Sequence, residues 1–60
     1  MERIVIGKSA DVEAEYGQAA DAPYTLAILT NEAVISIEGY STYAAAKCGA
    51  EGQPFEYVGD

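Results

Sequence analysis

The hydrophobic and polar positions along this chain form short β-branched and aliphatic runs, each bounded by glycine, proline or polar residues. Such runs are typical of strands. The first covers residues 3–7 and is continuously apolar from Ile4 to Ile6, which predicts a strand inside a sheet rather than at its edge. Three more strands are predicted over residues 24–30, 34–38 and 55–58.

The second and third runs predict a β-hairpin. Between them lie Asn31 and Glu32, which we expect to form a tight turn, although the pair lacks the glycine of the strongest hairpin turns. Alternation in the third run predicts that Ile35 and Ile37 face the core and that their neighbours face water. The expected core comprises the tyrosines and the large apolar side chains Ile4, Ile6, Leu26, Ile28, Ile35, Ile37 and Phe55.

Residues 9–21 fit two structures. Acidic residues alternate with apolar ones, which is the period of a strand, but the same stretch is rich in alanine and glutamate, which favour a helix. We predict a helix over residues 10–16 with Ser9 as its N-cap and Gly17 as its stop, followed by a loop over residues 17–23. In that helix Val12 and Tyr16, continued by Ala19, would form the buried stripe.

A second helix is predicted over residues 43–48. Ser41 or Thr42 would cap its start, and Gly49 or Gly52 would end it. The predicted fold is therefore α+β: one compact domain over residues 1–60, in a shortened ferredoxin-like order, β-α-β-β-α-β. It contains a small antiparallel or mixed four-stranded sheet with one or two short helices. The alternative is an antiparallel sheet covered by one helix, with residues 10–16 as an extra strand.

The balance of charged residues limits the kinds of partner that this protein can bind. The 60 residues contain ten carboxylates, three cationic side chains and no histidine, for a net charge of −7. A field of this sign repels nucleic-acid phosphates and attracts basic surfaces. Direct binding of nucleic acid is therefore not expected.

Candidate chemistry is sparse. Without histidine, a Ser–His or Cys–His pair cannot form and the commonest neutral-pH base is missing. Asp11, Glu13 and Glu15 have the spacing that begins a calcium loop, but the central glycine and closing glutamate are absent. We expect no catalytic activity, no metal and no cofactor.

Cys48 is the single cysteine, so no internal disulfide supports the fold, and we expect it to be a small buried residue. The N-terminal apolar run is far shorter than a secretory core, and no run approaches the ~20 residues of a membrane span. A cytoplasmic protein without membrane contact is expected.

The candidate binding residues are acidic side chains and tyrosines. The stretch from Asp11 to Asp21 contains four carboxylates and no cation, and tyrosine is favoured at interfaces. A Lys/Arg groove built for phosphates could accept such an array. The predicted partner-binding residues are Asp11, Glu13, Glu15, Asp21, Glu32, Glu38, Tyr24 and Tyr40.

Small size, acidity, absence of histidine and an α+β pattern together resemble the phage-encoded inhibitors of bacterial defence, in particular anti-CRISPR proteins and other DNA mimics. This resemblance is one of composition over the whole chain. It implies a monomeric, stoichiometric inhibitor in the bacterial host cytoplasm. Such an inhibitor would occupy the basic DNA-binding surface of a Cascade-type effector. The alternative is a small adaptor or oligomerisation module that uses a sheet edge and exposed tyrosines.

Overall fold

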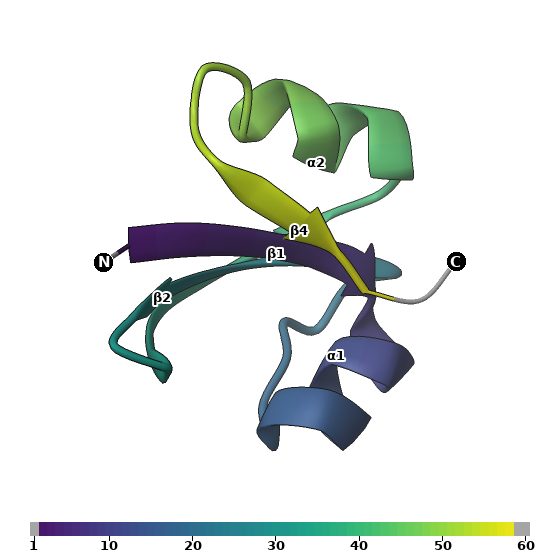
Figure 1. Ribbon diagram of the computed structural model, residues 1–60. Coiled ribbons are helices and arrows are strands. Elements are labelled where there is room, and N and C mark those ends of the chain that lie inside the picture. Colours follow the sequence, from purple (N-terminus) through teal and green to yellow (C-terminus); the bar gives the residue numbers. More distant parts are fainter. Residues whose placement is uncertain (1, 59–60) are drawn as a thin grey trace.

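The computed structural model describes residues 2–58 and has the predicted order of elements (Figure 1). These elements form an α+β fold with a mixed four-stranded sheet and two helices. Residues 9–16 form a helix, which excludes the alternative in which residues 10–16 are an extra strand and one helix covers the sheet. The elements are β1 (Glu2–Lys8), α1 (Ser9–Tyr16), β2 (Tyr24–Thr30), β3 (Ala33–Tyr40), α2 (Tyr43–Gly49) and β4 (Phe55–Tyr57).

The spatial order of the strands is β3-β2-β1-β4. β1 pairs antiparallel with β2 and parallel with β4, and β2 pairs antiparallel with β3. β1 is therefore an inner strand, as its apolar run predicts. The strands that α1 joins, β1 and β2, are direct antiparallel neighbours rather than the parallel pair of a βαβ unit.

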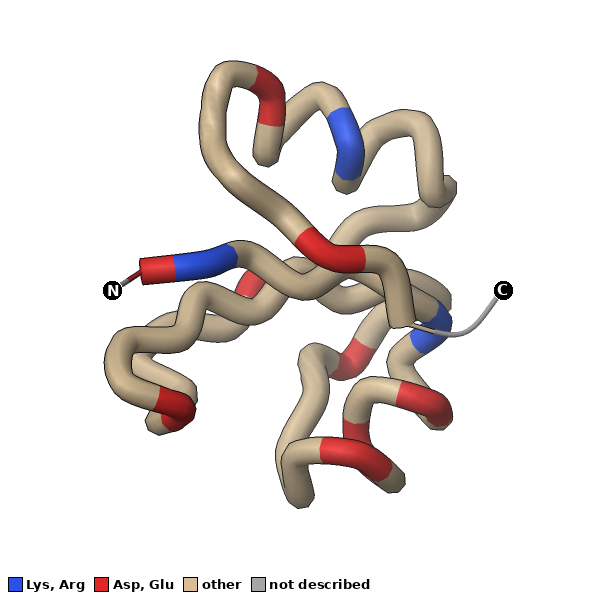
Figure 2. Tube along the Cα trace, in the orientation of Figure 1, with Lys and Arg blue, Asp and Glu red and all other residues tan. Residues whose placement is uncertain are grey.

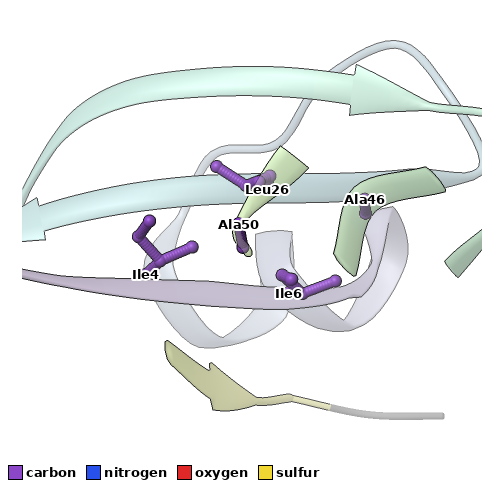
Figure 3. Close-up of a cluster of buried hydrophobic side chains, with 5 residues drawn as sticks. All are labelled: Ile4, Ile6, Leu26, Ala46 and Ala50. Atoms are coloured by element: carbon purple, nitrogen blue, oxygen red, sulfur yellow. The ribbon is translucent and has the colours of Figure 1, made fainter. Parts of the chain in front are cut away.

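The two helices cover opposite faces of the sheet, with α2 above it and α1 below it in Figure 1. Because successive strand residues point to opposite faces, β1 contributes to both layers. The α2-side core contains Ile4, Ile6, Leu26, Ala46 and Ala50 (Figure 3). The α1-side core contains Val5, Val12, Ala27 and Leu29.

Helix α1 ends as predicted but begins differently. Gly17 adopts the left-handed conformation (φ 83°), and its N–H donates to the Glu13 carbonyl at 2.7 Å. The expected N-cap role of Ser9 is wrong: Lys8 is the N-cap and makes no side-chain capping bond. The Ser9 hydroxyl instead bonds to the Ala22 carbonyl and, at 2.7 Å, to the Thr25 hydroxyl.

Helix α2 begins with a side-chain cap. Thr42 is the N-cap, and its Oγ1 accepts a hydrogen bond from the Ala45 N–H at 3.1 Å. The helix includes Gly49, and its C-cap is Ala50 in a right-handed conformation, so Gly49 is not the expected glycine stop. The left-handed glycine that follows is Gly52, with φ of 85°. The inward residues of the helix, Ala46 and Ala50, are small and fully buried, which lets the helix lie close to the sheet.

The hairpin turn is left-handed at both central residues, with φ of 54° at Asn31 and 66° at Glu32. Positive φ at both positions defines the type I′ turn that suits the twist of a two-residue hairpin. Asparagine tolerates this conformation, whereas for glutamate it is strained. The turn is therefore the predicted one, although its second residue is poorly suited to it.

A β-bulge in β3 changes which side chains reach the core. Val34 pairs with Leu29 and Ser36 pairs with Ile28, so Ile35 is the extra residue. The bulge brings Val34 and Ile37 onto the same face, packed against the α1-side core. The expectation that Ile35 faces the core is wrong, since its side chain is 59% exposed.

Strand β4 is short and lies close to β1. The Val58 N–H donates to the Ile6 carbonyl at 2.8 Å, which extends the parallel pairing one residue beyond Tyr57. A Cβ at Gly7 would lie 1.6 Å from the Val58 carbonyl oxygen, so only glycine permits this approach. Phe55, expected in the core, is 39% exposed because β4 is an edge strand.

Candidate acidic interface

Four of the eight predicted binding residues gather on the α1 side of the sheet. Asp11, Glu13 and Glu15 lie on α1, and Asp21 lies in the loop that follows it (Figure 2). All four are exposed. The helix places them there because Val12 turns inward to the α1-side core, which leaves its polar neighbours outside.

These four carboxylates occupy two flanks of α1. Asp11 and Glu15 are four residues apart and therefore share one flank, with about 6 Å of rise between them. Glu13 projects from the other flank, where it and Asp21 line a hollow that is open to solvent. The other residues around the hollow are small or apolar: Ser9, Ala10, Ala19, Ala20, Ala22 and Pro23.

One exposed cation, Lys8, adjoins this surface as the N-cap of α1. No lysine or arginine lies between Lys8 and Lys47 in the sequence. Arg3 is occupied elsewhere: its guanidinium bridges Glu32 at 2.8 Å and Glu56 at 2.9 Å. Both ion pairs found within residues 2–58 use Arg3, so neither neutralises an α1 carboxylate.

The other four predicted residues lie away from α1. Glu32 is in the hairpin turn, where it pairs with Arg3. Glu38 pairs in register with Leu26 of the α2-side core, and Tyr40 packs against that core. Tyr24 lies opposite Tyr40 on the neighbouring strand, and paired residues share a face. The structure therefore divides the predicted set between two faces and one turn.

Tyr40 and Glu38 form a local pair on the α2 side. The Tyr40 hydroxyl donates to the Glu38 carboxylate at 3.0 Å. This hydrogen bond, with smaller effects of desolvation and of the Glu38 charge, raises the pKa of Tyr40 above its ordinary value of 10.0. A raised pKa in the folded state favours the neutral phenol. The resulting stabilisation is complete below pH 10 and is lost as the pH rises through the raised pKa.

Three tyrosines form an aromatic row that the sequence does not predict. Tyr43 at the start of α2 lies 6.2 Å from Tyr24 and 5.1 Å from Tyr57, measured between ring centroids. The Tyr43–Tyr57 pair is edge-to-face, an arrangement that aromatic rings favour. Contacts among three separate elements leave no periodic pattern in the sequence, so no signal there could have revealed them.

Cys48 and the carboxylates are the remaining groups that could carry chemistry. Cys48 is exposed, so its expected burial is wrong: Ala46 and Ala50, on either side of it, take the inward positions of α2. Within residues 2–58 no three His, Cys, Asp or Glu side chains are grouped closely enough to hold a metal ion. No helix in that range is long and apolar enough to cross a membrane.

Comparisons with known proteins found no matching family model, no matching curated protein and no matching solved structure.

Proposed function

We propose that this protein is a stoichiometric inhibitor whose acidic α1 side occupies the basic nucleic-acid-binding site of another protein. The observation that carries the proposal is the composition of residues 9–46. This segment contains six carboxylates and no lysine or arginine, and the fold gathers four of the six on α1 and its following loop.

The geometry of α1 supports mimicry of a phosphate backbone. The rise of about 6 Å between Asp11 and Glu15 is close to two base-pair steps of about 3.4 Å each. Glu13 and Asp21 place further negative charge on the opposite flank of the helix. A groove with cations on both walls would therefore meet carboxylates on both sides of α1.

The net charge of −7 adds a long-range contribution. Complementary fields accelerate the encounter of two proteins and make it sensitive to salt. The resemblance to anti-CRISPR proteins makes a Cascade-type effector in a bacterial cytoplasm the proposed target. The inhibitor would be a phage product acting as a monomer.

The proposal is tested by titrating the protein into a purified Cascade-type complex and measuring the binding of its labelled target DNA by gel shift. We expect DNA binding to be lost near one inhibitor per effector at low salt, and inhibition to weaken as the salt concentration rises. Full DNA binding at a large excess of the protein would reject this target.

Two variants of equal charge locate the site. D11N/E15Q removes two carboxylates from one flank of α1, whereas E2Q/E51Q removes two exposed carboxylates, one at the start of β1 and one after α2. We expect D11N/E15Q to raise the inhibitory concentration at least tenfold and E2Q/E51Q to change it less than threefold. If both variants raised the inhibitory concentration equally, inhibition would depend on net charge and not on the position of the carboxylates.

A further inference from the structure

Strand β3 has one unpartnered edge. It is eight residues long and outermost in the sheet, so only β2 pairs with it within residues 2–58. Alternate residues of such an edge strand direct N–H and C=O groups away from the sheet, where another extended chain can bind them. The opposite edge, β4, is three residues long and offers much less backbone.

The bulge places an apolar side chain beside this edge. Ile35 is the extra residue of the bulge and belongs to neither core. Its exposure of 59% is the highest among the exposed large apolar residues described. A strand added to β3 could cover Ile35 with an apolar side chain of its own.

Charge decides which strand can be added. Glu38 lies on β3, and no cation occurs on β2, on β3 or between them. Glu32, in the turn before β3, is already paired with Arg3 of β1. A second copy of this chain would bring the same carboxylates and another −7 to the edge, and like charges across paired strands are destabilising. A strand with lysine or arginine would instead place a cation near the Glu38 carboxylate.

We propose that the β3 edge binds an extended cationic segment of a partner protein as an additional strand. Backbone hydrogen bonds would supply the affinity, while contacts to Ile35 and Glu38 would select a sequence that carries both apolar and basic residues. This surface is separate from α1, so the proposal does not depend on the proposed inhibition.

The test uses two synthetic ten-residue peptides, one alternating valine with lysine and the other alternating valine with glutamate. Each is titrated into the ¹⁵N-labelled protein at about 0.15 M salt, where surface charges are screened beyond ~8 Å. We expect the lysine peptide to shift the amide signals of Ala33–Tyr40 in a saturable manner. The glutamate peptide should leave them unchanged.

Two single-charge variants act as a matched pair. I35K replaces the exposed apolar contact by a cation at the edge, and Q18K adds the same charge at an exposed position in the loop after α1. We expect at least tenfold weaker binding of the lysine peptide to I35K and less than a threefold change for Q18K. Circular dichroism would verify that both variants are folded.

Three outcomes would overturn the proposal. Shifts confined to Ser9–Tyr16 would place the peptide on α1, and an absence of shifts would exclude the edge. Shifts of the β3 amides on concentrating the protein alone would identify a second copy as the occupant. Inhibition of an effector is measured independently by the gel shift.

Discussion

At the scale of the residue, Thr25 shows how a buried polar group organises this small fold. Thr25 is fully buried in β2, yet its hydroxyl is satisfied. It bonds to the Ser9 hydroxyl at 2.7 Å and accepts from the Ala20 N–H at 3.0 Å. One side chain thus joins the start of α1, the loop after it and the sheet, and thereby positions the loop that carries Asp21.

We predict that T25V destabilises the protein by about 1 kcal/mol, because the isosteric valine leaves the partly buried Ala20 N–H without its acceptor. Urea unfolding followed by circular dichroism measures the loss. T30V is the matched control, since Thr30 is a half-buried threonine of the same strand. Equal stability of T25V and wild type would show that the network contributes nothing.

At the level of secondary structure, the hairpin turn has the geometry that suits a two-residue connection, but one of its residues is strained. The type I′ turn matches the strand twist, yet it holds Glu32 at φ 66°. The Glu32 carboxylate also pairs with Arg3, but such exposed pairs contribute only about 0–1 kcal/mol. Backbone strain is therefore the larger effect at this position.

We predict that E32G is more stable than E32Q by about 1 kcal/mol. Both variants lose the ion pair, but only glycine relieves the left-handed strain. The comparison therefore isolates the backbone contribution, and thermal unfolding of the two variants measures it. If E32Q were the more stable variant, the turn in solution would not be left-handed at residue 32.

The bulge at Ile35 changes which side chains of β3 share a face. Period-two alternation predicts Ile35 and Ile37 on one face, and that prediction holds only for an uninterrupted strand. One inserted residue breaks the alternation, so that Val34 rather than Ile35 shares a face with Ile37. Register depends on pairing with β2, a contact that the sequence of β3 alone does not encode.

At the scale of the whole molecule, charge opposes folding. A net charge of −7 on 60 residues, with one of the three cations already bound to two carboxylates, leaves repulsion that a small core must overcome. The same field is the basis of the proposed binding. The feature that supports function is thus also a cost to stability.

We predict that raising NaCl from about 20 mM to about 500 mM increases the melting temperature by about 4–8 °C, which corresponds to about 1 kcal/mol for a domain of this size. Screening weakens the repulsion more than it weakens the Arg3 ion pairs. The D11N/E15Q variant should show a smaller increase, because it carries fewer repelling charges. A fall in melting temperature with salt would mean that the Arg3 pairs dominate.

Local sequence patterns predict the strands, the helices, their order and the sign of the surface field, although residues 9–21 fit both a helix and a strand. Short β-branched runs, the alanine-rich segments, Gly17 and Thr42 act within a few residues, so local propensity and periodicity reveal them. The three-dimensional packing sets the strand order and the exposure of Ile35. It also sets the hydrogen bonds of Ser9 to the loop and to β2, and the division of the predicted binding residues between two faces. Each of these depends on contacts between residues distant along the chain, which no local pattern specifies.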